Sequence, residues 1–274
     1  MLNRWLFMHL PKLRQVLTRI SYEYISIFDK DINVLFMNYG FADLDAGAVP
    51  LELSPEDEKH RYQAQLYHHV AGSISWSGLD VLEVSSGRGG GANYIRRHFN
   101  SNSFIGVDLS TEAVNFCNRY YSVEGLSFTQ ANAESLHFPD NAFDVVINLE
   151  ASLYYPDIER FFSHVERILK LGGHFLYADM RYVDEIDLWR VQLKNTGLEL
   201  LREEDITRNV VRALALDQAR KKDLVDRYIP RVLRRIFYHF GGISGDGLAR
   251  GEPKPGERIY FFFVFRKKEA AYRI

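Results

Sequence analysis

The chain has 274 residues, of which 46% are hydrophobic and 26% are charged. This composition excludes a disordered, collagen-like or low-complexity chain, and a chain of this length can bury a core without disulfides. Its 34 basic and 36 acidic residues give a net charge of −2, which argues against a nucleic-acid-binding protein. The single cysteine, Cys117, excludes an intrachain disulfide framework and a cysteine-rich zinc site. We therefore expect no metal centre and a reducing, cytoplasmic location.

Two segments carry most of the positive charge. Residues 1–20 hold four basic residues and no acid, and residues 207–240 hold nine basic residues against three acids. The rest of the chain then has a net charge of −12. We favour two solvated helix faces as the explanation. The alternative is peripheral contact with an anionic membrane, where each basic residue contributes about 1 kcal/mol.

Before residue 76 the chain is expected to be mainly helical. Apolar residues recur at helical spacing over 13–28, which predicts an amphipathic helix. Ser54-Pro55, followed by acids, has the order typical of a helix start.

From residue 80 onward, short apolar runs alternate with helical patterns. This alternation predicts a doubly wound, mostly parallel sheet covered by helices on both faces. The predicted strands are 80–84, 104–107, 126–129, 143–149 and 174–178, and helices are predicted after residue 91, from Thr111 and over 157–170.

The last part of the chain has a different pattern. Residues 206–239 predict one or two helices, divided near Pro230 because proline interrupts helical hydrogen bonding. An apolar strand is predicted over 258–265. A helix pair inserted before the last strand is a candidate lid.

A glycine-rich turn follows the first strand of the alternating region, with Gly87, Gly89, Gly90 and Gly91 within five residues. Glycine permits positive φ and close approach of a ligand to the backbone. The helix that follows presents N–H donors suited to a carboxylate or phosphate. A tight turn without a ligand is the plainer interpretation, and the number of glycines disfavours it.

Two polar residues at later strand ends suggest a nucleoside ligand. Asp108 ends the second strand about 20 residues after the turn, where an acid can accept hydrogen bonds from ribose hydroxyls. Asn132 follows the third strand and could read an adenine edge, or simply belong to a polar loop. Gly87-x-Gly89-x-x-Ala92 also satisfies the dinucleotide pattern, so both ligand classes stay open on these residues alone.

Taken together, the motifs resemble those of class I S-adenosylmethionine-dependent methyltransferases. Within that class the chain is most similar to lipid O-methyltransferases of the phthiotriolone and phenolphthiotriolone dimycocerosate type, over roughly residues 35–265. The segments that carry the resemblance are Met37–Gly40, Val81–Ala92, Asp108, Asn132–Glu134, Phe143–Val146, Glu150–Ser152, Leu171–Gly173, Tyr177–Arg181 and Arg220–Pro230.

The resemblance implies a seven-stranded Rossmann-like sheet and S-adenosylmethionine as cofactor. It implies four regions: an N-terminal helical cap and cofactor lid (1–75), a cofactor-binding core (76–205), a helical substrate lid (206–255), and the last core strand with a tail (256–274). The implied cofactor contacts are the methionine part at Glu83, Ser85, Gly87 and Gly89, the ribose at Asp108, the adenine at Asn132 and Ala133, the sulfonium under Tyr39, and a further contact at Glu150.

Three positions depart from the family pattern. Ser85 replaces the usual first glycine of the turn, and Asn132 replaces an acid. Leu153 replaces a histidine that related enzymes carry after the fourth strand. If that histidine deprotonates the acceptor, another residue must do so here, and the candidates are Glu150, Tyr154, Tyr155, His239 and Tyr39.

We predict O-methylation of a small amphiphilic, lipid or polyketide-type acceptor, in a pocket walled by helices 13–28 and 206–239. Arg181 and Trp189 are expected near the acceptor, with a core position as the alternative for Trp189. A phenol, carboxylic acid or activated carbon acceptor would need little base. One rival is a methyltransferase fold that binds cofactor without methylating, as a regulator or a cyclase-like enzyme. The other is a nucleotide-dependent oxidoreductase. The oligomeric state stays open.

Overall fold

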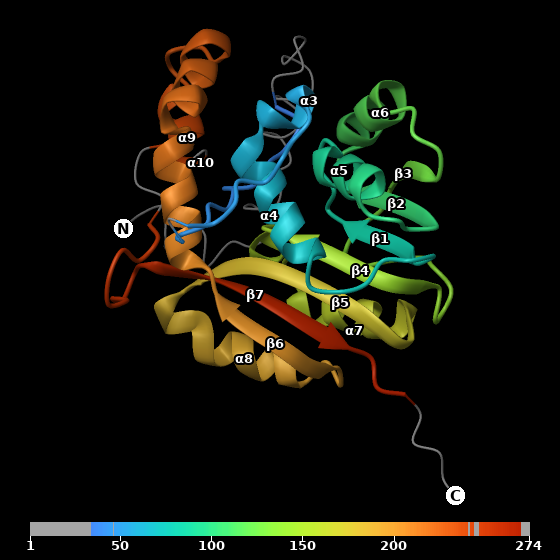
Figure 1. The fold of residues 1–274 in the computed structure, drawn as a ribbon. Coiled ribbons are helices and arrows are strands. Elements are labelled where there is room, and N and C mark those ends of the chain that lie inside the picture. Colours follow the sequence, from blue (N-terminus) through green and yellow to red (C-terminus); the bar gives the residue numbers. More distant parts are fainter. Residues whose placement is uncertain (1–33, 46, 241, 244–246, 270–274) are drawn as a thin grey trace, which may run out of the picture.

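The core of the protein is a seven-stranded sheet with strand order β3-β2-β1-β4-β5-β7-β6, shown in Figure 1. The computed structural model describes residues 34–45, 47–240, 242–243 and 247–269. The neighbouring strands from β3 to β5 pair in parallel, and β7 is antiparallel to both β5 and β6. The strands are β1 Asp80–Val84, β2 Ser103–Asp108, β3 Leu126–Gln130, β4 Phe143–Leu149, β5 Leu169–Tyr182, β6 Glu199–Asp205 and β7 Arg258–Arg266.

Helices cover both faces of this sheet (Figure 1). The helices α4, α5, α6 and α9 bury apolar residues against one face, and α7 and α8 bury theirs against the other. The helices are α3 Pro55–Glu58, α4 Arg61–Ala71, α5 Gly90–His98, α6 Thr111–Tyr120, α7 Ile158–Ile168, α8 Ile186–Lys194, α9 Thr207–Tyr228 and α10 Arg234–Phe240, with short 3-10 turns at Ser152–Tyr154 and Val183–Glu185. The predicted doubly wound, mostly parallel sheet is therefore confirmed.

The strand side chains show why this architecture forms. Phe262 packs on the face covered by α4, α5, α6 and α9, whereas Phe261 and Phe263 pack on the opposite face. Because successive side chains of a strand point to opposite faces, a strand that is apolar at every position must be covered on both sides. The sequence around β7, Tyr-Phe-Phe-Phe-Val-Phe, meets this condition.

Two elements differ from the sequence-based expectation. The strand β6 was not among the strands predicted from the pattern, because its sequence Glu-Leu-Leu-Arg-Glu-Glu-Asp is charged and most of it is exposed at the sheet edge. The strand β5 begins at Leu169 rather than at residue 174, so α7 ends at Ile168 rather than residue 170. The amphipathic helix predicted over 13–28 lies outside the described residues.

The helical insertion before the last strand is present. The helix α9 ends at Tyr228 and α10 begins at Arg234, so the interruption falls around Pro230 as expected. The three acids of this segment all pair with basic neighbours: Asp217 with Arg220, Asp223 with Arg227, and Asp226 with Lys222 and Arg234. Over the described part of the chain, no helix combines the length and the apolar character that a membrane crossing requires.

The packing of α5 against α4 leaves no room at Gly91. A Cβ atom at this position would lie 1.8 Å from the ring of the buried Tyr67. We expect Gly91→Ala to lower the free energy of unfolding by about 3 kcal/mol, because neither backbone nor ring can move freely in a packed core. Urea denaturation measures the change. Gly251→Ala, where an added Cβ meets no atom within 4 Å, is the matched control and should unfold like the native protein.

Candidate active site

A pocket opens at the carboxyl edge of the sheet, where the strand order reverses between β1 and β4. Its walls include Ser85, Ser86 and Gly87 after β1, Asp108 at the end of β2, and Glu150 after β4. Open α/β sheets bind ligands at this position because the connections on either side of the reversal leave toward opposite faces. The segment Leu35–Asn38 forms another wall of the pocket.

The glycine turn and Asp108 form one hydrogen-bonded unit. Gly87 has a φ of +54°, and its N–H donates to Asp108 Oδ2 at 2.8 Å. The N–H of Ser110 donates to the other oxygen, Oδ1, at 2.8 Å. Burial raises the pKa of the Asp108 carboxyl, while these N–H donors act in the opposite direction. The remaining lone pairs of this carboxylate can accept hydrogen bonds from a ligand in the pocket.

Glu83 lies in β1 beneath the turn and is almost fully buried, with 1% of its surface exposed. Tyr67 donates its hydroxyl to Glu83 Oε1 at 2.6 Å, whereas the buried Oε2 has no hydrogen-bond partner within the described structure. Burial raises the pKa of Glu83 to about 8. A buried carboxyl group with one unsatisfied oxygen is suited to a cationic ligand group.

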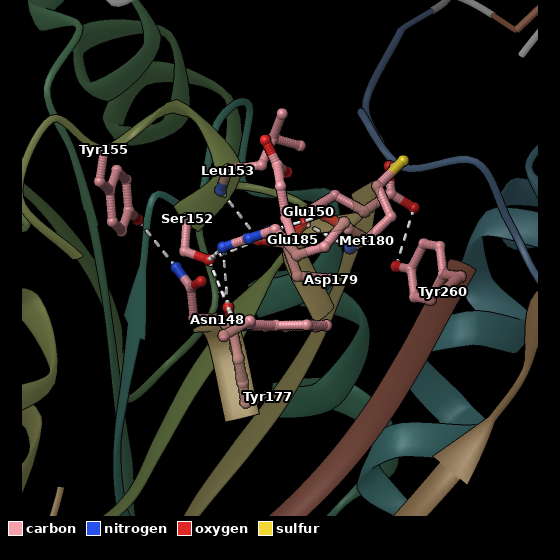
Figure 2. Close-up of polar contacts among 12 residues, drawn as sticks. Asn148, Glu150, Ser152, Leu153, Tyr155, Tyr177, Asp179, Met180, Glu185 and Tyr260 are labelled. Atoms are coloured by element: carbon pink, nitrogen blue, oxygen red, sulfur yellow. Dashed lines mark hydrogen bonds and ion pairs between the residues drawn. The ribbon is translucent and has the colours of Figure 1, made fainter. Parts of the chain in front are cut away.

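Glu150 is a further titratable side chain with an unusual environment. It has a left-handed backbone, with φ +50°, and its Oε1 accepts hydrogen bonds from the Tyr39 N–H at 2.8 Å and the Tyr260 hydroxyl at 3.0 Å. Figure 2 shows the contact with Tyr260. Burial raises the pKa of Glu150 to about 7, against the effect of these donors and of Lys221. A carboxyl group with this pKa in a pocket can accept a proton at neutral pH.

The turn that follows Glu150 is held by a buried polar network, shown in Figure 2. Asp179 Oδ2 accepts hydrogen bonds from Ser152 Oγ at 2.5 Å and from the Leu153 N–H at 3.1 Å. Arg181 lies 3.2 Å from the same oxygen and donates to Ser152 Oγ at 2.7 Å. These contacts fix the conformation of the turn.

Arg181 and Trp189 do not line the pocket. Trp189 is 1% exposed, donates its indole N–H to the Tyr177 hydroxyl at 3.1 Å, and lies under the Arg181 guanidinium, which is 4.6 Å from its ring centre. Trp189 therefore occupies the core position that we considered as its alternative, and Arg181 serves the network around Asp179.

The structure brings some of the predicted site residues together and separates others. Ser85, Gly87, Asp108, Glu150, Tyr154 and Tyr155 line the pocket. Glu83 and Gly89 lie in the strand and turn behind it. Asn132 and Ala133 lie outside the pocket lining, and Asn132 Oδ1 accepts a hydrogen bond from the N–H of Glu134 at 3.0 Å. His239 belongs to α10, and its side chain is outside the described structure.

Tyr39 contacts the site through its backbone. Its N–H binds Glu150, whereas its ring is outside the pocket lining and has the ammonium of Lys221 5.6 Å from its centre. A lysine of α9 is therefore one cation that this aromatic ring faces in the structure.

Three residues that contribute to the site were not expected from the sequence. Tyr67 comes from α4 and carries no local signal, because nothing in its neighbourhood indicates that its hydroxyl reaches Glu83. Ser86 was not singled out within the glycine turn, although it lines the pocket. Asn148 had a signal: it is a polar residue in the otherwise apolar end of β4, and it is fully buried.

Comparison with known proteins finds one matching family and several relatives that align with most of the chain. Residues 82–177 match a family described as "Methyltransferase domain". A phthiotriol/phenolphthiotriol dimycocerosates methyltransferase of Mycobacterium leprae is 38% identical over 85% of this chain and 86% of its own length. A fatty-acid O-methyltransferase of Mycolicibacterium smegmatis is 38% identical over 84% of this chain and 83% of its own length.

A solved structure shares the fold at low sequence identity. Geranyl diphosphate C-methyltransferase from Streptomyces coelicolor A3(2), in complex with Mg²⁺, geranyl diphosphate and S-adenosyl-L-homocysteine, has a TM-score of 0.61 and 17% identity. The likeness covers 90% of this chain and 98% of that chain.

The raised pKa of the buried Glu83 carboxyl makes the stability of the fold depend on pH. Between pH 4.5, the ordinary pKa, and about 8 the folded protein holds a proton that the unfolded chain has lost, so stability falls as the pH rises through this window. We expect Glu83→Gln to remove this contribution, so the stability of the variant relative to native protein rises by at least about 1 kcal/mol between pH 5 and pH 8. Urea denaturation at both pH values measures it.

Glu112→Gln makes the same replacement on the exposed face of α6 and is the matched control for the Glu83 variant. A relative stability of Glu83→Gln that stays constant between pH 5 and pH 8 would contradict the expectation.

Proposed function

The chain belongs to the S-adenosylmethionine-dependent methyltransferases, and from this premise we propose that it methylates an oxygen atom of a lipid-type acceptor. S-Adenosylmethionine is its cofactor. Neither the oxidoreductase nor the non-methylating alternative receives support from the relatives. The observation that carries the proposal is the position of Glu150, a carboxyl group with a pKa of about 7, in the wall of the pocket at the strand-order reversal.

The residues of the pocket wall and of the strand behind it fit this cofactor chemically. The unsatisfied Oε2 of Glu83 suits the ammonium of the methionine part, and the free lone pairs of Asp108 suit the ribose hydroxyls. Gly87 presents bare backbone to the pocket, where a side chain would crowd the wall, since a Cβ there would lie 3.2 Å from Met37 Sδ. We retain Gly89, Asn132 and Ala133 as proposed contacts from the family pattern.

When bound, the cofactor supplies an electrophilic methyl group on a sulfonium. Alignment of the acceptor oxygen with that methyl group is then the main requirement of the reaction. The rigid turn after β4, held by Asp179, fixes Glu150 and Tyr154 at the pocket wall. We propose that Glu150 accepts the proton of a hydroxyl acceptor, and that Tyr154 helps to position the acceptor.

Leu153 cannot take over the role of the histidine found in related enzymes, because its side chain has no group that accepts a proton. Its N–H is bound to Asp179, and its side chain packs against the apolar cluster that includes α4 and α9. Glu150 is therefore the better-placed proton acceptor, because it is the carboxyl group on the pocket wall next to this turn.

The names of the relatives define two acceptor classes. A phthiotriol-type lipid offers a hydroxyl group, and a fatty acid offers a carboxylate. We propose that residues 206–255, with α9 and α10, and residues 1–75 enclose the apolar part of such an acceptor, while residues 76–205 and 256–274 form the core. Support for this division comes from the contact between Lys221 of α9 and the backbone oxygen of Tyr39, at 3.5 Å.

An assay with labelled S-adenosylmethionine tests the function. We expect label transfer to long-chain hydroxylated lipids or fatty acids, with a product heavier than the acceptor by one methylene unit in mass spectrometry. Short-chain acceptors of the same head group are the control and should be methylated poorly. Tight binding of the cofactor without transfer to any hydroxylated lipid, fatty acid, phenol or polyketide would contradict the proposal.

Replacing Glu150 separates the two acceptor classes. With a hydroxyl acceptor, the native rate should rise with pH through about 7 as Glu150 loses its proton, and Glu150→Gln should lower the rate about 10²–10⁴-fold and abolish this dependence. With a fatty acid the rate should change little, because a carboxylate is already deprotonated. Initial rates between pH 5.5 and 9 measure both effects.

Tyr260→Phe is the companion to the Glu150 variant. It removes a hydroxyl that stabilises the charged form of Glu150, so the midpoint of the rate profile for a hydroxyl acceptor should move to higher pH. A profile that keeps its midpoint in this variant would argue against Glu150 as the titrating group.

A further inference from the structure

Ser85 stands at a position where the family pattern has glycine, and its backbone shows why glycine is usual. Its φ is +62°, a left-handed conformation that is strained for a residue with a Cβ atom. Glycine would adopt it freely. A serine at this position therefore requires a compensating contact.

The compensating contact is a hydrogen bond to Tyr155. The oxygen atoms of Ser85 and Tyr155 are 2.6 Å apart. The Tyr155 hydroxyl also accepts a hydrogen bond from Asn148 Nδ2 at 2.9 Å, a contact visible in Figure 2. The same nitrogen donates to the carbonyl oxygen of Val84 at 2.8 Å. This chain of contacts joins the cofactor turn after β1 to the segment that follows β4.

The direction of the two hydrogen bonds made by Asn148 follows from the fixed end of the chain of contacts. The Val84 carbonyl can only accept, so the nitrogen of the buried Asn148 amide must face it, and the second N–H of that nitrogen goes to Tyr155. Burial raises the pKa of Tyr155, so its hydroxyl stays protonated. That hydroxyl accepts from Asn148 and keeps one hydrogen to donate, and Ser85 Oγ lies within reach as an acceptor at 2.6 Å.

With Tyr155 as the donor to Ser85, the arrangement that we propose, Ser85 keeps its own hydroxyl hydrogen for another acceptor. Ser85 lines the pocket, as does Tyr155. Within the turn, Ser85 lies two residues from Glu83, whose unsatisfied oxygen suits the ammonium of the cofactor. An α-amino acid carries its carboxylate one carbon away from its ammonium, so a donor next to Glu83 can reach it.

We propose that Asn148, Tyr155 and Ser85 form an oriented hydrogen-bond relay that presents the Ser85 hydroxyl to the carboxylate of S-adenosylmethionine. The relay also ties the cofactor turn to the turn that carries Glu150 and Tyr154. Ser85 is then a binding residue, and Tyr155 and Asn148 are positioning residues that act through it. This inference rests on the cofactor and is independent of the acceptor.

Ligand binding to the full-length protein tests the relay without an acceptor. Titration calorimetry compares two ligands: S-adenosylhomocysteine, which has the carboxylate, and 5′-methylthioadenosine, which lacks it. The variants are Ser85→Ala, which keeps the Cβ and removes the hydroxyl, Tyr155→Phe, which keeps the ring packed on Phe161, and the double variant. Each single variant should weaken S-adenosylhomocysteine binding about tenfold and leave 5′-methylthioadenosine binding unchanged.

Two further results are expected if the relay acts as one unit. The double variant should bind S-adenosylhomocysteine no more weakly than Ser85→Ala, since the hydroxyl through which Tyr155 acts is already gone. Ser85→Gly should bind as weakly as Ser85→Ala, yet its cofactor-free form should melt at a higher temperature than that of Ser85→Ala, because glycine takes the left-handed backbone without strain.

Asn141→Gly is the matched control for the backbone effect. Asn141 also has a left-handed backbone, with φ +54°, in an exposed loop away from the pocket. This variant should bind both ligands like the native protein. Affinity of Ser85→Ala for S-adenosylhomocysteine within twofold of native, equal losses for the two ligands, or losses that multiply in the double variant would each overturn the proposal.

Discussion

Parallel pairing of β1 with β2 on one side and β4 on the other is the constraint on which the site depends. The register sets Val84 opposite Val107 and Glu83 opposite Ile147, so the carboxyl ends of three strands come to one edge of the sheet. The helices after β1 and β2 pack on one face, whereas α7 after β4 packs on the other. The resulting divergence opens the space in which Ser85, Asp108 and Glu150 meet.

Several features of the site lower the stability of the folded protein, and the rest of the fold must offset them. Glu83 is a buried and Asp108 a half-buried carboxyl group, both with raised pKa values, and Ser85 and Glu150 have left-handed backbones. Such features are unfavourable for the folded protein alone and are typical of sites that are completed by a ligand. The two apolar clusters on either face of the sheet supply the stability that permits them.

The helical insertion is joined to the cofactor side of the pocket by buried polar contacts. Asp217 of α9 accepts hydrogen bonds from Gln63 of α4 and from Arg220, and both Arg220 and Asn38 donate to Gln63. Since Asn38 belongs to a pocket wall, the position of α9 and the shape of the cofactor pocket are linked. The position of α9, on the proposed acceptor side, therefore depends on residues beside the proposed cofactor site.

The sequence by itself determined the fold class and the outline of the site. Alternating apolar strands and helices specified the doubly wound sheet, and the glycine turn, Asp108 and Glu150 occur at strand ends, which a parallel sheet must bring to one edge. The edge strand β6 could not be recognised, because an exposed, charged strand has no apolar pattern and forms only where β7 offers its hydrogen-bonding edge.

Only the tertiary structure decided the contacts between segments that lie far apart in the chain. Tyr67 reaches Glu83 from α4, Tyr260 reaches Glu150 from β7, and Tyr155 reaches Ser85 across the carboxyl edge of the sheet. Such contacts leave no local periodicity in the sequence, because they depend on how helices and strands pack rather than on their own residue patterns. The contacts of Tyr67 and Tyr260 lower the pKa values of two carboxyl groups that burial raises, and the contact of Tyr155 holds the Ser85 hydroxyl at the pocket wall.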